Sequence, residues 1–316
     1  MNLQQLEYIV AVDTHRHFVK AAEQCFVTQA TLSMMIKKLE EELNVTLFNR
    51  GKYPIEPTEI GVQLIAQARR VLHEAALMKQ LVADTQELVQ GDLHIGVIPT
   101  LAPYLLPLFL KTLLESYPLL HVKVNELSTE QIITALNKGQ IDVGILATPL
   151  QIESLREHPL FYERFLVFVS DAETVLTKHF VTPDDLDFSR LWLLEEGHCM
   201  RSQMLNICAL RAQQTNPSRL AYEAGSIESL LKIVEINKGL TIVPELAVYD
   251  FSTQQRNQVR EFIEPVPVRE ISLVTHQYFL KTKILNALKQ TIIEGVTPRL
   301  NSNIDTDTTI VGIQEH

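Results

Sequence analysis

The sequence predicts a small helical N-terminal module, a long connecting helix and a two-lobed α/β body. Three observations carry this prediction. Apolar residues recur at helical spacing through the first sixty residues, at heptad spacing up to about residue 87, and in alternating strand-like and helical segments from residue 93 onward. The chain has 316 residues, of which 46% are hydrophobic and 21% charged. This length exceeds that of one typical domain, and the composition is that of a globular protein.

Three short helices are predicted in the N-terminal module, residues 1–60. Asn2 is suited to cap the first helix, with Gln5 as its capping-box partner. The second helix covers about residues 18–24. The third begins after Thr28, a good N-cap residue, and its apolar positions face inward.

The second and third helices have the spacing of a helix-turn-helix, whose second helix enters the major groove of DNA. Glutamine pairs with adenine, threonine and serine bind bases or phosphates, and lysine neutralises phosphate. Two basic residues in a turn with Gly51 and Pro54 suit a wing that lies on the DNA backbone. The candidate DNA-binding residues are Thr28, Gln29, Thr31, Ser33, Met34, Lys37, Arg50, Lys52 and Thr58. The same pattern also fits a plain three-helix bundle with a polar outer face.

A single dimerising helix is predicted in the linker, residues 61–88. Apolar side chains there follow alternating steps of four and three, the heptad spacing of a coiled coil. Because a two-fold dimer would match two DNA half-sites, we expect these side chains to form a seam between two copies. The alternative is a helix packed on its own chain. The seam residues are Leu64, Ala68, Val71, Ala75, Met78 and Val82.

The body, residues 89–300, alternates predicted strands and helices, which implies two doubly wound lobes. Lobe I is expected at about 89–162 and 266–300, lobe II at about 163–265, and a polar, loosely ordered tail at 301–316. Ligands in such folds bind at the carboxyl ends of strands, between the lobes. The expected strands are 93–98, 120–124, 141–146, 191–194, 241–244 and 271–274, and the expected helices are 101–115, 130–138, 229–237 and 282–294.

Composition and motifs argue against several classes of function. The net charge of −10 disfavours a protein that coats nucleic acid nonspecifically, although an acidic body can carry a small DNA-reading module. There is no C-x-x-C pair and the ten histidines are scattered, so we expect no metal or other cofactor. Nucleotide-binding and nucleophile-elbow motifs are missing, so we expect no enzyme. Without a long apolar run or a signal peptide, we expect a cytoplasmic protein with no membrane partner.

Two of the three cysteines, Cys199 and Cys208, have only eight residues between them. His198 and Arg201 are near Cys199 in sequence, and a nearby cation favours the thiolate, which is the form that peroxides attack. Cys208 is close enough in sequence to resolve a sulfenic acid as a disulfide. If the residues between the cysteines are helical, their Cα atoms lie about 13 Å apart, whereas a disulfide needs about 7 Å or less. The pattern fits a redox switch in which disulfide formation unwinds this segment. It also fits two buried cysteines packed as small hydrophobic residues.

Five segments of the N-terminal region carry a sequence pattern that matches a known family without insertions or deletions. They are FVKAA (18–22), VTQATLS (27–33), IKKLE (36–40), LFNR (47–50) and TEIG (58–61). They resemble the winged helix-turn-helix of LysR-type transcriptional regulators. The resemblance implies a two-lobed effector domain similar to type II periplasmic binding proteins. It also implies assembly as a homodimer or homotetramer, with promoter DNA and RNA polymerase as partners. The chain departs from the family at Asn44, where glycine is usual, at Ala30, where proline is common, and at His17, where serine often caps the helix.

The body resembles the peroxide-sensing members of that family at residues 99–107, 128–131, 196–208 and 265–269. The resemblance implies that hydrogen peroxide is the signal, that oxidative-stress genes are activated, and that glutaredoxin or thioredoxin is the reductant. Ser202 replaces an acidic residue, which leaves the thiolate pKa open. The implied site residues are Cys199 (peroxidatic), Cys208 (resolving), Thr100 and Thr129 (peroxide binding), His198 and Arg201 (pocket shape) and Arg269 (thiolate stabilisation).

Two other functions fit parts of the sequence. The first is a LysR-type regulator that binds a small-molecule inducer between its lobes, because Thr100 and Thr129 would also suit a carboxylate or sulfate. The second is an enzyme or solute-binding protein on the two-lobed fold. The predicted helix-turn-helix argues against the second reading.

Overall fold

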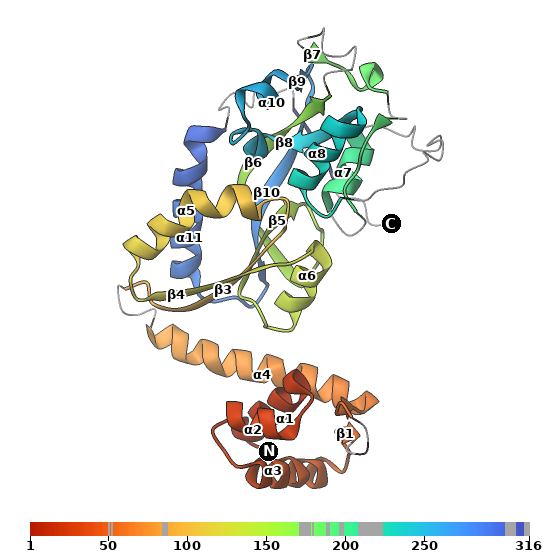
Figure 1. The fold of residues 1–316 in the computed structure, drawn as a ribbon. Coiled ribbons are helices and arrows are strands. Elements are labelled where there is room, and N and C mark those ends of the chain that lie inside the picture. Colours follow the sequence, from red (N-terminus) through yellow and green to blue (C-terminus); the bar gives the residue numbers. More distant parts are fainter. Residues whose placement is uncertain are drawn as a thin grey trace. The chain divides into compact units, whose positions relative to one another are not determined.

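The computed structural model describes residues 1–49, 51, 53–83, 88–170, 178, 180–187, 190–195, 199–207, 224–300 and 308–312. The chain divides into two compact units, Met1–Leu88 and Val89–His316, and Figure 1 shows their elements. Among the described residues, no helix is both long enough and apolar enough to cross a membrane.

The first unit is the predicted helical module with its wing. Its elements are α1 (Leu3–His15), α2 (Phe18–Gln24), α3 (Gln29–Leu43), β1 (Phe48–Asn49), β2 (Glu56–Pro57) and α4 (Glu59–Ala83). The predicted limits of α2 and the predicted start of α3 after Thr28 are confirmed. The strands β1 and β2 pair antiparallel, which gives the wing. Leu32, Ile36 and Leu39 of α3 are fully buried in the core of the unit.

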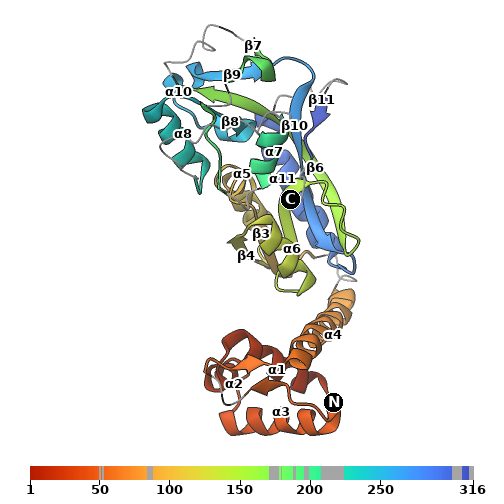
Figure 2. The same ribbon diagram turned by 90° about the vertical axis from the view of Figure 1, so that its right-hand side faces the viewer.

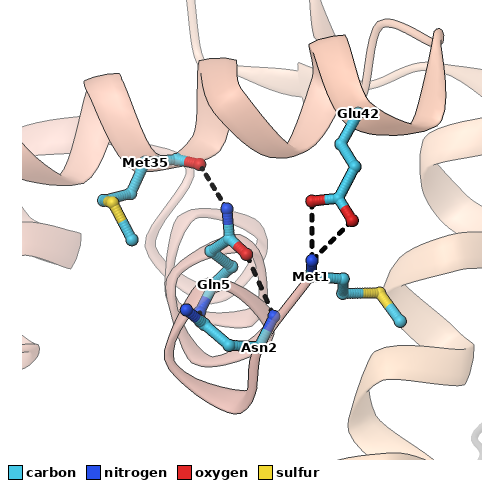
Figure 3. A network of polar contacts seen from close by, with 5 residues as sticks. All are labelled: Met1, Asn2, Gln5, Met35 and Glu42. Atoms are coloured by element: carbon cyan, nitrogen blue, oxygen red, sulfur yellow. Dashed lines mark hydrogen bonds and ion pairs between the residues drawn. The ribbon is translucent and has the colours of Figure 1, made fainter.

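The start of α1 is fastened to α3 at two points (Figure 3). The predicted capping box is present, because the Asn2 side chain accepts from the Gln5 N–H and the Gln5 side chain accepts from the Asn2 N–H. The other end of the Gln5 amide donates to the Met35 carbonyl at 3.3 Å. The N-terminal ammonium of Met1 lies 2.6 Å from Glu42. These contacts tie the first helix to both halves of the helix that is expected to read DNA.

Two departures from the family pattern keep the backbone geometry that the usual residues would provide. The His17 ring nitrogen Nδ1 accepts from the N–H groups of Val19 at 3.1 Å and Lys20 at 3.4 Å, so histidine serves as the N-cap of α2. Asn44 ends α3 in the left-handed region, with φ of 54°. Asparagine tolerates this region better than most residues other than glycine, which explains its presence there.

The long helix α4 packs on its own unit at its N-terminal end. Ala68 is buried in the core of the unit, and Leu64 packs against that core from the same face. Arg69 donates to Asp13 of α1 at 2.9 Å, which adds a polar tie. Two predicted seam residues are therefore already engaged within the chain.

The later seam positions are more open. Val71 and Met78 are exposed, Met78 at 71%, and Ala75 is half-buried. The side chain of Val82 lies outside the described part. The surface available to a second copy therefore begins at about Val71.

The described strands of the body form one mixed sheet in the order β4-β3-β5-β10-β6-β9-β7, with β11 paired to β10 and β8 paired to β6. The strands are β3 (Gly91–Val97), β4 (Leu120–Glu126), β5 (Val143–Thr148), β6 (Leu155–Val169), β7 (Phe180–Val181), β8 (Leu240–Pro244), β9 (Val259–Phe262), β10 (Val266–His276) and β11 (Thr308–Ile310). The expected parallel pairing holds for β4, β3 and β5. The strands β6 and β10 run antiparallel to each other and pass from one lobe to the other. Figure 2 shows these two long strands side by side.

Helices cover this sheet around two separate cores. They are α5 (Ala102–Ser116), α6 (Thr129–Asn137), α7 (Cys199–Ile207), α8 (Ile227–Asn237), α9 (Glu245–Val248), α10 (Thr253–Asn257) and α11 (Thr282–Val296), with short 3-10 helices at Pro183–Asp185 and Thr297–Arg299. One core gathers apolar residues from β3, β5, α5, α6 and α11. The other gathers residues from the far half of β6 with β8, α7 and α8. The two cores match the two lobes that the alternating pattern predicts.

Two expectations about the body are corrected. Residues 191–194 form no regular strand but two isolated bridges, Leu191 to Leu240 and Leu194 to Ala224, because the two ends of the segment pair with different parts of the chain. The polar tail is ordered at residues 308–312, where β11 pairs parallel with β10 and Val311 is buried. Tertiary contacts outweigh local polarity there, because an edge strand and a buried valine stabilise the segment.

We expect Gly61→Ala to loosen the N-terminal unit. A Cβ at Gly61 would lie 2.2 Å from the carbonyl oxygen of Leu47 and 3.0 Å from the Thr58 hydroxyl. Because the clash is with backbone, the cost is about 1–3 kcal/mol. Amide hydrogen exchange of full-length protein should show lost protection in α1–α3 and unchanged protection in the body.

Gly51→Ala is the matched control, because a Cβ there meets no atom within 4 Å. Equal protection in the Gly61→Ala and Gly51→Ala proteins would show that the close approach at Gly61 does not constrain the unit.

Candidate functional site

Cys199 lies where the two cores of the body meet. It is the first residue of α7, is 7% exposed, and packs with the apolar residues of lobe I. Met200, Met204 and Ile207 of the same helix pack with the apolar residues of lobe II. The helix that carries the cysteine therefore contributes to both lobes.

Arg269 of β10 lies in the same region and is fully buried. Its Nη1 donates to the Thr100 hydroxyl at 3.2 Å, and its Nη2 donates to the Thr100 carbonyl at 3.4 Å. The guanidinium carbon lies 5.9 Å from the centroid of the Phe165 ring. These contacts hold a permanent positive charge inside the protein, next to the loop at the end of β3.

Glu163 neutralises this charge, and sequence reasoning did not identify it as part of the site. Its carboxylate accepts from Arg269 Nε at 2.8 Å and from the Leu246 N–H at 2.8 Å, and it is fully buried. Burial raises the pKa of Glu163, and the Arg269 guanidinium opposes that rise. Glu163 and Arg269 are direct partners in the β6–β10 register. The strand β6 also contains Glu157 and Arg164, so nothing in its sequence singled out Glu163.

Opposing influences act on the Cys199 thiol. Burial raises its pKa above the ordinary value, and the Thr129 hydroxyl and the Arg269 guanidinium lower it, without cancelling the effect of burial. The cation that favours the thiolate therefore comes from Arg269 on a distant strand. Arg201, which is near Cys199 in sequence, donates through Nη1 to the Leu194 carbonyl at 2.6 Å.

The Thr129 hydroxyl is buried and makes no hydrogen bond of standard geometry with the described residues, although it lies near enough to Cys199 to lower the pKa of the thiol. Thr129 is the first residue of α6, whose N-cap is Ser128. A buried polar group without a partner is rare and calls for an explanation. Its position beside a thiol leaves a hydroxyl available to a small polar molecule.

The structure thus gathers Cys199, Thr129, Arg269 and Thr100 through direct contacts and electrostatic influence. Two other predicted site residues, His198 and Cys208, lie outside the described residues. Within the described part of the chain, no group of three or more His, Cys, Asp or Glu side chains is arranged to hold a metal ion.

The predicted DNA-binding residues lie at the start and along the outer face of α3. Gln29 and Lys37 are exposed, and Met34 is 63% exposed. Thr28 and Thr31 bond each other through their hydroxyls at 2.8 Å, and Thr28 also accepts from the Thr31 N–H. The two threonines therefore shape the start of the helix as well as its surface.

The remaining candidates in this unit differ in position. Ser33 is half-buried on α3. The hydroxyl of Thr58 donates to the Thr46 carbonyl at 2.6 Å and accepts from the Gly61 N–H at 3.0 Å, so it serves the start of α4. Arg50 and Lys52 lie outside the described residues.

We expect the buried ion pair to behave as a unit. Replacing Arg269 with methionine should cost about 3–5 kcal/mol, because Glu163 is then buried without its partner, and the double variant Glu163→Gln/Arg269→Met should regain most of that loss. Urea denaturation of the four full-length proteins measures the coupling. The exposed pair Lys111–Glu115 on α5 is the control and should show no measurable coupling. Additive effects at Glu163 and Arg269 would contradict the pairing.

Comparisons with known proteins show the family to which the chain belongs. Residues 3–62 match the family model described as "Bacterial regulatory helix-turn-helix protein, lysR family", and residues 86–296 match "LysR substrate binding domain". The chain is 36% identical over 274 residues to the hydrogen peroxide-inducible genes activator of Haemophilus influenzae, covering 87% of this chain and 90% of the relative. It is 34% identical to the DNA-binding transcriptional dual regulator OxyR of Escherichia coli, covering 96% and 98%.

A solved structure is also similar over most of the chain. Full-length OxyR C199D from Pseudomonas aeruginosa aligns with a TM-score of 0.78 at 31% identity, covering 93% of this chain and 98% of that one. The resemblance that the sequence motifs indicated is confirmed at the level of the family and of its OxyR-like members. The chain belongs to the LysR family of DNA-binding transcriptional regulators.

Proposed function

We propose that this regulator senses hydrogen peroxide through a reversible Cys199–Cys208 disulfide and then activates oxidative-stress genes. The observation that carries the proposal is the environment of Cys199: a buried thiol influenced by a fully buried arginine, with a threonine hydroxyl beside it that has no partner among the described residues. The names of the curated relatives support the same signal.

The proposed chemistry uses peroxide as the oxidant and both thiols as reductants. The Cys199 thiolate attacks one peroxide oxygen, the S–O bond forms as the O–O bond breaks, and the departing hydroxide takes up a proton to become water. The Cys208 thiol then attacks the sulfenic sulfur, the S–S bond forms, and a second water leaves. Two thiols lose two electrons, and one peroxide becomes two waters.

The residues around Cys199 have distinct parts in the first step. The Arg269 guanidinium and the Thr129 hydroxyl favour the thiolate, and Thr100 is tied to Arg269 through its own hydroxyl. The free hydrogen-bonding capacity of Thr129 suits a peroxide oxygen. His198 and Arg201 would shape the rest of the pocket.

The second step requires α7 to break. Its ends, Cys199 and Ile207, are eight residues apart, so their Cα atoms lie about 12 Å from each other. Cys208 follows Ile207 directly, and adjacent Cα atoms are about 3.8 Å apart. The Cα atom of Cys208 therefore stays at least about 8 Å from that of Cys199 while α7 is intact, wherever Cys208 points. A disulfide needs about 7 Å or less.

Unwinding α7 would reach both lobes, because the helix packs in both cores. We propose that this change of packing passes through a homodimer or homotetramer to the spacing of the DNA half-sites, and so to RNA polymerase at the promoter. The exposed residues of α4 from Val71 onward would form the seam between copies. Glutaredoxin or thioredoxin in the cytoplasm would restore the thiols.

On the DNA side, we propose that α3 enters the major groove. Gln29 and Met34 are exposed and free to meet base edges, and Lys37 is exposed beside Glu41. Arg50 and Lys52 of the wing would contact phosphates.

The alternative, a regulator of the same family that binds a small-molecule inducer, is favoured by one observation. The unpaired Thr129 hydroxyl would also suit a carboxylate or sulfate. A protein insensitive to peroxide but stabilised by such a ligand would support this alternative.

The deciding experiment treats reduced full-length protein with low micromolar hydrogen peroxide and maps thiols and disulfides by mass spectrometry. We expect a rapid Cys199–Cys208 bond that dithiols reverse. In promoter footprints, Cys199→Ser should still bind DNA and no longer respond to peroxide, and Cys208→Ser should stop at the sulfenic acid. Cys25→Ser is the matched control, because the half-buried Cys25 has no part in the reaction. A footprint of Cys199→Ser that still changes with peroxide would sink the proposal.

We expect Thr129→Val to separate reactivity from stability. Valine keeps the shape but removes a buried hydroxyl without a partner, so thermal stability should not fall. Once Cys199 is ionised, its thiolate can accept from the Thr129 hydroxyl, so losing that hydroxyl should slow sulfenic acid formation about tenfold at neutral pH.

The pH profile provides a second readout for Thr129→Val. Burial already raises the pKa of Cys199, so the rate should rise with pH through the range of ordinary thiols, and Thr129→Val should displace the profile to higher pH. Thr134→Val, at an exposed site on the same helix, should change neither rate nor profile. A Thr129→Val rate equal to that of the unaltered protein would remove Thr129 from the site.

A further inference from the structure

The C-terminal strand β11 returns to the part of the body that carries the reactive cysteine. Residues 308–310 pair parallel with residues 266–268 of β10, immediately before Arg269. The Val311 N–H donates to the Val268 carbonyl at 2.8 Å, and the Val311 side chain is buried in the core of lobe II. The strand is thus anchored to the sheet on one side.

On its other side, the strand is held by two amide side chains of α7. Gln203 Nε2 donates to the Val311 carbonyl at 2.9 Å, and Asn206 Nδ2 donates to the Gly312 carbonyl at 3.0 Å. Gln203 is fully buried and Asn206 partly so. Residues 203 and 206 are three apart, so both lie on one face of the helix. These two hydrogen bonds require α7 to be helical, because only the helix places both amides on the same face.

We propose that β11 and the two residues after it, Val311 and Gly312, form a clasp that favours the thiol form, with Gln203 and Asn206 as positioning residues acting through it on the Cys199–Cys208 couple. This inference rests on the proposed disulfide. Forming that disulfide breaks α7, and the two bonds from α7 to Val311 and Gly312, directly after β11, are then lost. Interactions present in the thiol form and absent from the disulfide form favour the thiols and raise the reduction potential.

The Gln203 amide strengthens the link between release of the clasp and unwinding of α7. Its oxygen Oε1 is buried and has no partner among the described residues, so within them the bond to Val311 is the hydrogen bond that satisfies this amide. If the strand leaves, the whole amide is buried and unsatisfied inside an intact α7, which is costly. Release of the clasp and unwinding of the helix therefore favour each other.

The surroundings leave space for such a movement. A cavity of about 520 Å³ adjoins the clasp, and its lining includes Asn206 and Ile207 at the end of α7, Phe262 of β9, and Ile310 and Val311 of the clasp. Densely packed interiors resist rearrangement. A cavity at this junction lets the end of the helix and the strand shift without displacing the sheet.

The test uses two independently altered proteins, the full-length double variant Gln203→Met/Asn206→Leu and a chain that ends after residue 307 and so lacks the clasp. Glutathione redox titration gives the reduction potential of the couple, and mass spectrometry gives the rates of sulfenic acid and disulfide formation. Both forms should hold the disulfide about tenfold more strongly, a potential about 30 mV more negative for this two-electron couple. Sulfenic acid formation at Cys199 should stay within about twofold of the unaltered rate, while the disulfide step becomes faster.

Asn237→Ala is the matched control, since Asn237 makes a similar amide-to-carbonyl bond on α8, to Ile233 at 3.3 Å, away from the clasp. A potential unchanged from the unaltered protein in both test forms would overturn the clasp while leaving the peroxide sensor intact. If the unaltered protein itself forms no Cys199–Cys208 bond, the proposed function fails and the clasp fails with it. The truncated chain keeps the inference testable if the double variant does not fold.

Discussion

The arrangement of this protein's body depends on one buried ion pair. Glu163 and Arg269 face each other across the two strands that pass between the lobes, and neither side chain is exposed. A guanidinium cannot shed its proton, and burying it without a counter-charge would be prohibitively costly. Glu163 therefore allows a permanent positive charge to exist beside Thr100 and to act on Cys199. The ion pair therefore links the two strands, lies where the lobes join, and supplies the charge that acts on the Cys199 thiol.

In the proposed mechanism, the helix α7 converts that local chemistry into a structural change. Burial works against the Cys199 thiolate, and Arg269 and Thr129 favour it; in the proposed reaction this thiolate leads to a disulfide. The product of that reaction is incompatible with the helix that presents it, because an intact α7 keeps its ends too far apart for a disulfide. Since α7 packs in both cores and bonds to Val311 next to β11, unwinding it would change contacts in both lobes and at the C-terminal strand.

Local features of this fold were predictable from the sequence, and distant ones were not. The capping box at Asn2 and Gln5 and the cap at Thr28 involve residues within three positions of each other, and such signals are readable in order along the chain. Arg269 was assigned to the site through family resemblance. Glu163 was missed, because the two residues are 106 positions apart and only strand register joins them. The strand β11 was missed for a related reason. It lies in a polar tail, and its partner in β10 is about forty residues away in sequence.

The central claim is that forming the disulfide unwinds α7. Amide hydrogen exchange of the full-length protein in its thiol and disulfide forms, read residue by residue over Cys199–Ile207, tests it most directly. The account predicts that α7 amides are protected in the thiol form and lose that protection when the disulfide forms, while amides of the neighbouring helix α8 keep theirs. Full protection of α7 in a protein shown to carry the Cys199–Cys208 bond would contradict it.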